Sequence, residues 1–451
     1  RRLHSEMAES LNQTKRADGS PLYESTQTGN FDLYLPFIEK GMELLNSHGR
    51  MGYIAPNLWM KNEYGKGLRK KLKRTRQLDH WVDFRSYQVF AEASTYTALQ
   101  FFKGSGTDAV RCIIAPDGDI TRINWNAPDG TIPWEELQTD DAWNIMADSE
   151  RALVKRLDQN CSSLADFSEG ITVGIQTSAD HIYHLTRLAP GKYQTKNGEE
   201  VYLEDEIMHP LVSNQEAKRY QFPKTDTWLL FPYDLSTDPP KLFSADIMIS
   251  KFPLAWRYLK THERELRDRE SGKMDIDNKW YAYNYPKNLD KQERSKLGVA
   301  ETVKYLRLFY DKEGEFYFNN VRVNGILPNR VGDGWFLLGV LNAPVADFIF
   351  RIMAKAKSGG YYEANKQFIA PLPIPDASET QKTKVKEGAQ HLQQLHTQKR
   401  WAGEDLNLRR QSRQIYSLVR LTKLRYRPRQ RPERSRLSRA GLTLAIAVLG
   451  L

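Results

Sequence analysis

The chain has 451 residues, 40% of them hydrophobic, and its 66 Lys and Arg exceed its 56 Asp and Glu to give a formal net charge of +10. This length and apolar content are enough for two or more domains with buried cores. The two cysteines, Cys112 and Cys161, exclude a disulfide framework and a cysteine-based zinc site, and they fit a reducing cytoplasm. The late apolar stretch over 440–451 is shorter than the roughly twenty residues of a spanning helix, so we expect a soluble cytoplasmic protein with no membrane partner.

The positive charge is concentrated at the end of the chain. Residues 401–451 carry twelve Lys and Arg but three Asp and Glu, so the remainder of the chain is almost neutral. Net charge therefore does not predict nucleic-acid binding by the body of the protein. The basic stretch over 69–74 can follow a phosphate backbone or form a solvated helix face, and the sequence leaves both open.

The first predicted elements are a helix, a strand and a second helix. Asn30 is a suitable N-cap and Gly49 a natural stop for the first helix. The apolar run over 51–55 predicts a strand covered on both faces in a parallel sheet, and the runs over 80–84 and 95–102 predict two more strands. Helical spacing places Tyr34, Phe37, Ile38, Gly41 and Leu45 on one face of the first helix, and Tyr64, Leu68 and Leu72 on one face of the second.

These elements and their sequence blocks resemble the last third of the catalytic domain of TaqI-like adenine-N6 DNA methyltransferases, including the fused restriction-modification enzymes called type IIG. The matching blocks are Asp32-Leu33-Tyr34, Phe37-Ile38-Glu39, Gly49-Arg50-Met51-Gly52-Tyr53-Ile54, Pro56-Asn57-Leu58-Trp59, Gly65-Lys66-Gly67-Leu68-Arg69, Val89-Phe90 and Ala93-Ser94-Thr95-Tyr96-Thr97. Several spaced blocks in order are far rarer by chance than one short motif.

The resemblance continues into the target-recognition domain of that family. It is carried by Gly170 to Asp180, His209 to Val212, Lys218-Arg219-Tyr220, Phe231-Pro232-Tyr233, a helix over 253–266, Leu338 to Asn342, Gly359 to Glu363 and Pro371 to Pro375. The implied fold is α/β: the residual end of a Rossmann-like methyltransferase sheet, followed by a mixed α/β recognition domain. The implied divisions are a catalytic-domain remnant over 1–105, a connecting segment over 106–165, the recognition domain over 166–376, a polar helical segment over 377–408 and a basic atypical tail over 409–451.

The resemblance also implies the chemistry. Methylation of adenine N6 requires a flipped base stacked on an aromatic ring beside the methyl donor. The family uses an Asn-Pro-Pro-Tyr/Phe loop for the base and an upstream glycine-containing turn for S-adenosylmethionine. We expect both to be missing from this chain, because Asp238-Pro239-Pro240-Lys241 offers a lysine that cannot stack and is better interpreted as a turn. We therefore expect this chain alone to bind no S-adenosylmethionine and to be inactive.

Candidate DNA-contacting residues are Arg, Lys, Asn, Gln and aromatic side chains on the resembling blocks. Asn57 and Trp59 follow the strand end at Pro56, where ligands sit in open α/β sheets, and are candidates for lining the base pocket. Tyr361 and Tyr362 have packing at the end of the domain as their alternative role. The candidates for contact with double-stranded DNA are Gln176, Thr177, Lys218, Arg219, Tyr361, Tyr362, Asn365 and Lys366.

No metal site is assigned. His181 and His184 lie near Asp180, but this set lacks the full group of ligands that a metal needs. The leading hypothesis is a site-specific adenine-N6 DNA methyltransferase of a restriction-modification or phage-defence system, present here as a fragment that retains target recognition. The alternatives are a stand-alone DNA-specificity module acting with a separate catalytic chain, and an inactive remnant. The arginine-rich tail is a DNA-binding arm, a disordered tail or, as we favour, a translated frameshift.

Overall fold

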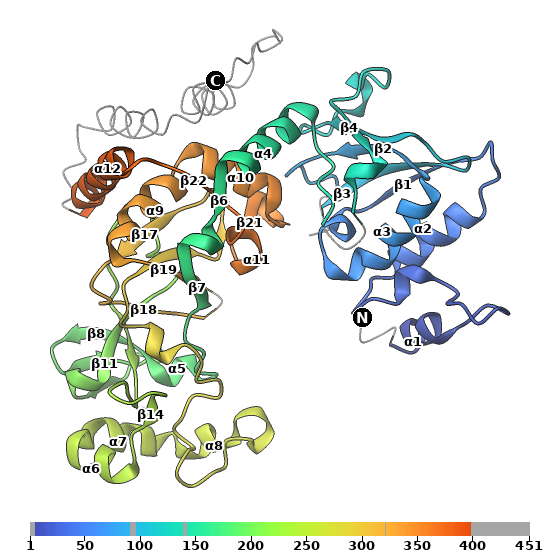
Figure 1. Ribbon diagram of the computed structural model, residues 1–451. Helices are drawn as coiled ribbons and strands as arrows, with labels where there is room; N and C mark the ends of the chain where they lie inside the picture. Colours follow the sequence, from blue (N-terminus) through green and yellow to red (C-terminus); the bar gives the residue numbers. More distant parts are fainter. Residues whose placement is uncertain (1–4, 91–95, 139–141, 321, 398–451) are drawn as a thin grey trace. The chain divides into compact units, whose positions relative to one another are not determined.

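The computed structural model describes residues 5–90, 96–138, 142–320 and 322–397. The chain divides into two compact units: unit 1 is 1–159 with 355–361, and unit 2 is 160–354 with 362–451. Both units are mixed α/β, which confirms the predicted fold class (Figure 1). The tail predicted over 409–451, the end of the polar segment after 397, and Ala93-Ser94-Thr95 lie outside the described residues.

A five-stranded sheet in the order β1-β3-β2-β4-β5 forms the centre of unit 1. β2 and β4 run parallel, whereas β1 with β3, β3 with β2, and β4 with β5 are antiparallel. Because β2 and β4 are parallel, both finish at the same end of the sheet. In open α/β folds, ligands bind at the end where the parallel strands finish. The strands are β1 (Arg50–Pro56), β2 (Leu78–Asp83), β3 (Thr97–Lys103), β4 (Ala109–Ile114) and β5 (Gly130–Pro133).

β1 corrects the expectation of a parallel strand covered on both faces. It runs antiparallel to β3, and its outer edge pairs with no other strand in the described part of the chain. Gly52 and Ile54 are exposed on one face, whereas Met51 and Tyr53 on the other approach the helix residue Gly41. An apolar run in a sequence does not report which faces of the strand are covered.

Helices α2 (Tyr34–Glu43) and α3 (Lys66–Thr75) lie against the sheet of unit 1 (Figure 1). α2 begins after Leu33, later than the predicted N-cap Asn30. Phe37, predicted on its core face, is 65% exposed, because the buried face includes a carboxylate that apolar spacing does not reveal. In α3, Leu68 and Leu72 are buried as predicted.

That buried carboxylate belongs to Glu39, which is fully buried. It accepts hydrogen bonds from the backbone N–H groups of Glu24 at 2.9 Å and Ser25 at 2.8 Å. Lys71 of α3 donates to Glu39 at 2.9 Å and to Glu43 at 2.7 Å. This network ties α2, α3 and the turn at 24–26 together with every oxygen of Glu39 in use.

The segment 106–165, predicted as a connection, belongs largely to the sheet. β4 and β5 extend the sheet beyond β2, and α4 (Asp148–Asn160) follows them. Pro116-Asp117-Gly118 and Pro128-Asp129-Gly130, whose composition favours turns, lie between elements of one unit and not between two domains. The later segment 355–361 also belongs to unit 1, where the Tyr96 hydroxyl donates to the backbone oxygen of Lys357 at 2.5 Å.

Unit 2 contains a six-stranded sheet, β10-β9-β8-β12-β11-β18, and a four-stranded sheet, β17-β15-β19-β7. The loop with Asp238-Pro239-Pro240 lies between the two strands of the β13-β14 hairpin, as its turn composition predicts. The remaining pairs are β16 with β21 and β22 with β6. The strands are β6 (Cys161–Ser163), β7 (Ser168–Val173), β8 (His184–Ala189), β9 (Lys192–Gln194), β10 (Glu200–Tyr202), β11 (Met208–Val212), β12 (Thr227–Leu230), β13 (Tyr233–Asp234), β14 (Lys241–Leu242), β15 (Lys296–Ala300), β16 (Thr302–Val303), β17 (Leu308–Asp311), β18 (Tyr317–Phe318), β19 (Val323–Pro328), β21 (Tyr361–Glu363) and β22 (Pro373–Pro375).

Helices of unit 2 cover these sheets. The helix predicted over 253–266 is two helices, α7 (Pro253–Thr261) and α8 (Glu263–Gly272), which meet at His262. Ala255, Tyr258, Leu259 and Leu266, which share one face at helical spacing, are buried. The other helices are α5 (Asp180–Tyr183), α6 (Ala245–Lys251), α9 (Gly334–Leu341), α10 (Pro344–Met353), α11 (Lys366–Ile369) and α12 (Glu379–Thr397).

α12 completes the core of unit 2. Val385, Ala389 and Leu392 recur at helical spacing and are buried, and α12 packs on the apolar helix α9 (Figure 1). In the described residues no single helix has the length and apolar content of a membrane span. The bent pair Val331–Leu341 and Pro344–Met353 has that composition, but most of its apolar side chains are buried in the unit.

Candidate nucleic-acid interface

A row of amide and hydroxyl side chains lies where β7, β11 and β18 of unit 2 end. Asn320 Nδ2 donates to Gln176 Oε1 at 3.2 Å, and Asn319 Nδ2 donates to Ser213 Oγ at 2.9 Å. Asn214 Nδ2 continues the row by donating to a backbone oxygen of β16 at 3.3 Å. We call these five residues, Gln176, Asn320, Asn319, Ser213 and Asn214, the amide row.

Backbone pairing fixes the amide row in place. The N–H of Ile175 donates to the oxygen of Phe318 at 2.7 Å, and the N–H of Asn320 donates to the oxygen of Ile175 at 3.1 Å. This approach requires glycine at 174, because a Cβ there would lie 2.3 Å from the Phe318 oxygen. Ile175 is 1% exposed and anchors the loop in the core, so the exposed Gln176 extends from a rigid support.

Cationic side chains surround the amide row. Arg307 donates to the backbone oxygen of Asn214 at 2.8 Å, and Arg219 donates to that of Leu306 at 2.9 Å while its guanidinium lies 5.2 Å from the Tyr305 ring centre. Cations near hydrogen-bonding side chains suit a nucleic-acid surface, because phosphate contacts give affinity and amides read base edges. Exposed cations of the same loops are Lys218, Lys304, Arg322 and Lys366.

Several candidate residues therefore lie in or beside this surface. Gln176 is part of the amide row, and Lys218 and Arg219 lie on the loop that follows it. Asn365 Nδ2 donates to Glu363 Oε1 at 2.7 Å, and Lys366 is exposed at the start of α11.

Tyr362 takes the packing role that the sequence left open, since its ring lies 6.2 Å from that of Phe350 on a strand paired with β16. Tyr361 is 38% exposed and belongs to unit 1.

Thr177 does not have the predicted position. It is fully buried, and its hydroxyl donates to Asp180 Oδ1 at 2.6 Å and accepts from the N–H of Ala179 at 3.1 Å. These two bonds close the turn into α5, so Thr177 holds the loop that presents Gln176. Sequence position alone cannot separate these neighbours, because one residue projects outward and the next inward.

Trp59 also corrects a prediction, because it is fully buried and cannot line a base pocket. Its indole N–H donates to Gln100 Oε1 at 3.2 Å. Its ring makes edge contacts with Trp81 and Trp143 at centroid distances of 5.8 and 5.7 Å. Asn57 is partly exposed, and its backbone N–H donates to the oxygen of Tyr96 at 3.2 Å, which leaves its side chain at the end of β1.

The loop after β2 contains groups that the sequence analysis did not select. Phe90 is 45% exposed there, in the block that carries the family resemblance. Lys61 and Asp83 lie at the same end of the sheet. Burial lowers the pKa of the Lys61 ammonium to about 8, and Arg85 adds to that effect while Asp83 opposes it. Shifted titratable groups beside exposed aromatic rings are typical of functional sites.

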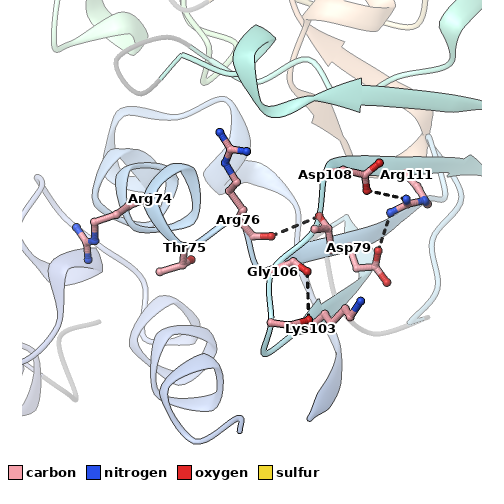
Figure 2. Close-up of a pocket in the computed structure, with 10 residues that line it drawn as sticks. Arg74, Thr75, Arg76, Asp79, Lys103, Gly106, Asp108 and Arg111 are labelled. Atoms are coloured by element: carbon pink, nitrogen blue, oxygen red, sulfur yellow. Dashed lines mark hydrogen bonds and ion pairs between the residues drawn. The ribbon is translucent and has the colours of Figure 1, made fainter. Parts of the chain in front are cut away.

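A cavity of about 370 Å³ lies at the opposite end of β2 and β4 (Figure 2). Arg111 bridges Asp79 at 2.9 Å and Asp108 at 2.8 Å there, and Arg74, Arg76 and Lys103 are the other cations of the lining. The pKa of Asp79 is held below its usual range mainly by its hydrogen bond with His80. Asp79 lies near the start of β2, so the cavity is at the end of the sheet away from the end where β2 and β4 finish.

The basic stretch at 69–74 is mostly structural. Arg69 is 1% exposed and donates to the backbone oxygens of Trp59 at 2.6 Å and Asn62 at 2.9 Å. Lys71 is buried against Glu39, and Arg74 forms an ion pair with Glu24. The solvated-face interpretation therefore holds for Lys70 and Arg74, and phosphate contact by the whole stretch does not fit the structure.

One further expectation concerns a metal. A search of the described residues, His181, His184 and Asp180 included, finds no group of three or more His, Cys, Asp or Glu that could hold a metal ion. The expectation that this chain alone binds no S-adenosylmethionine stays a prediction.

Comparison with known proteins extends the picture. Residues 7–90 match the family model described as Eco57I restriction-modification methylase. The type II restriction enzyme and methyltransferase RM.Eco57I of Escherichia coli is 23% identical over 369 residues, which cover 76% of this chain and 36% of that protein. The type II methyltransferase M.BstVI of Geobacillus stearothermophilus is 23% identical over 373 residues, which cover 76% of this chain and 61% of that protein.

The matched part of this chain therefore spans 36% and 61% of the length of these two relatives. One solved structure, that of the type IIL restriction-modification enzyme MmeI in complex with DNA, shares the fold. It has a TM-score of 0.53 at 13% identity and covers 99% of this chain and 55% of that chain.

Proposed function

Residues 7–90 form an Eco57I-type restriction-modification methylase domain in a chain homologous to type II methyltransferases, and from this premise we propose a function for the two units. Unit 2 recognises a specific double-stranded DNA sequence, and unit 1 supplies part of the site at which adenine N6 is methylated. The whole protein uses S-adenosylmethionine as methyl donor and acts in restriction-modification or phage defence.

One observation carries the assignment to unit 2. The amide row places several hydrogen-bonding side chains on a rigid backbone. The exposed cations Lys218 and Arg322 lie within a few residues of it in the sequence. Base edges are read by such amides and phosphates are held by such cations.

At the ligand end of unit 1, Phe90 replaces Trp59 as the aromatic candidate for the target base. A flipped base needs an exposed ring for stacking, which Phe90 offers and Trp59 does not. Asn57 is partly exposed at the same end of the sheet and offers a side-chain amide. We expect this chain alone to bind DNA without methylating it, because its sequence contains no Asn-Pro-Pro-Tyr/Phe loop to hold the target base.

The test uses the full chain and a random pool of double-stranded DNA at fixed salt. We expect enrichment of one sequence family, and incubation with labelled S-adenosylmethionine should leave that DNA unlabelled. Absence of any sequence preference would refute recognition by unit 2. Incorporation of label into adenine by this chain alone would refute the division of labour and retain the enzyme class.

The outer edge of β1 favours a second candidate, a specificity module that acts with a separate catalytic chain. The backbone groups on the outer edge of β1 pair with no strand in the described residues, and Ile54 of β1 is 41% exposed. An open edge of this kind accepts a further strand. Methyl transfer that appears only after mixing with a separately produced catalytic chain would support this alternative.

A further inference from the structure

The pair formed by Gln176 and Asn320 has a particular arrangement of unused hydrogen-bonding atoms. Their one mutual bond runs from Asn320 Nδ2 to Gln176 Oε1 at 3.2 Å. In the described part of the chain, Gln176 Nε2 and Asn320 Oδ1 take part in no further hydrogen bond. The pair therefore offers one amino group and one carbonyl oxygen without another partner among the described residues, and turning both amides over would leave one of each again.

One base edge matches a neighbouring donor and acceptor. In the major groove, adenine presents N7 as an acceptor and its N6 amino group as a donor, and a single Asn or Gln usually reads both. Guanine presents two acceptors there and cytosine a donor, so neither satisfies both atoms of the pair. We propose that Gln176 and Asn320 together read one adenine of the DNA target, an inference that rests on the proposed recognition role of unit 2.

The surroundings of the pair support this role. Both residues sit on bridged backbone, since Ile175 pairs with Asn319, and Gln176 pairs with Tyr285. A preorganised support reduces the entropy lost on binding. Arg322 lies two residues after Asn320 and Lys287 two residues after Tyr285, and both are exposed. These cations are placed to contact phosphates beside the base that the pair reads.

The test begins with the target sequence that the full chain selects from random DNA. Each adenine of that target is then replaced in turn by 7-deazaadenine, which lacks the N7 acceptor, or by purine, which lacks the N6 amino group. One adenine should be sensitive to both analogues in the wild-type chain. Loss of a bidentate contact should weaken binding by about 10- to 100-fold.

Single substitutions locate the contact. Gln176→Ala and Asn320→Ala should both remove the preference for adenine at that same base pair and leave the other positions and the affinity for unrelated DNA unchanged. Gln176→Glu exchanges the free donor for an acceptor and should shift the preference at that position from adenine towards cytosine. Asn197→Ala is the matched control, an exposed amide in the turn between β9 and β10 at the opposite edge of the sheet that contains β18.

The outcomes separate the inference from the function on which it rests. A wild-type chain without sequence preference refutes the recognition role, and the inference fails with it. A chain that keeps its preference while both alanine variants leave every position unchanged, or change different base pairs, refutes the inference alone. Thermal unfolding of each variant, together with binding to unrelated DNA, distinguishes a lost contact from a lost fold.

Discussion

Replacing Glu39 with glutamine is expected to lower the free energy of unfolding of unit 1 by about 3 kcal/mol. Glu39 is fully buried, and its oxygens accept from the N–H groups of Glu24 and Ser25 and from Lys71. Glutamine keeps the shape but presents an amino group as a donor, so one buried donor loses its acceptor at about 1–3 kcal/mol. Breaking a buried ion pair costs up to about 3–5 kcal/mol of unfolding free energy. Lys71 keeps its contact with Glu43 at 2.7 Å, so we expect a cost between these two ranges, at about 3 kcal/mol.

Hydrogen exchange measured by mass spectrometry across a urea series resolves the two units. Peptides from 30–75 should lose protection at lower urea in Glu39→Gln, whereas peptides of unit 2 should not change. Lys70→Met is the matched control, because Lys70 is exposed on α3 next to Lys71, and the effect of its loss should lie within about 0.5 kcal/mol of zero. The reasoning is refuted if Glu39→Gln shifts the transition of unit 1 no further than Lys70→Met does.

Three other predictions follow from the structure. Burial lowers the pKa of the His209 imidazole to about 4 from an unfolded value near 6.5. Unit 2 therefore loses unfolding free energy as the pH falls through that interval, because only the unfolded chain binds the proton readily. His209→Phe keeps the stacked contact with Tyr317, so the decrease in unfolding free energy between pH 7 and 5, measured in urea, should be about 2 kcal/mol smaller than in the wild-type chain. Gly174→Ala should lower the unfolding free energy of unit 2 by about 1–3 kcal/mol and weaken its preference for one DNA sequence, because the new Cβ would meet the backbone of 318–319. Gly170→Ala, on β7, which ends just before Gly174, is the control in thermal unfolding, because its Cβ would meet nothing within 4 Å. Deleting 409–451 should flatten the salt dependence of DNA binding and leave sequence preference unchanged; loss of that preference at fixed salt would show the tail to be a recognition arm instead.

Local spacing predicted the secondary structure well where one apolar face decides it. Leu68 and Leu72 in α3, and Val385, Ala389 and Leu392 in α12, are buried as their spacing indicates. Apolar spacing also predicted Phe37 to be buried, which is wrong. The buried face of α2 instead contains Glu39, which forms an ion pair with Lys71 of α3. Polar core groups of this kind leave no periodic signal in the sequence.

The candidate interface was only partly predictable for a different reason. Gln176 was found from its block, but its partner Asn320 is 144 residues away and has no motif of its own. Trp59 and Thr177 were selected by position, yet both are fully buried, since the direction of a side chain depends on tertiary packing. Phe90 was visible in a matching block, and only its exposure distinguishes it from Trp59.

The return of 355–361 to unit 1 decides where unit 2 must be cut in a graft between relatives. A cassette cut at 160 and 376 would carry Lys357 and Gly360 away from the Tyr96 hydroxyl, to which they are joined by hydrogen bonds of 2.5 and 3.4 Å. It would also leave behind α12, which covers α9. A graft that changes specificity without loss of solubility should therefore replace 160–354 and 362–397 as two pieces and keep the host residues between them.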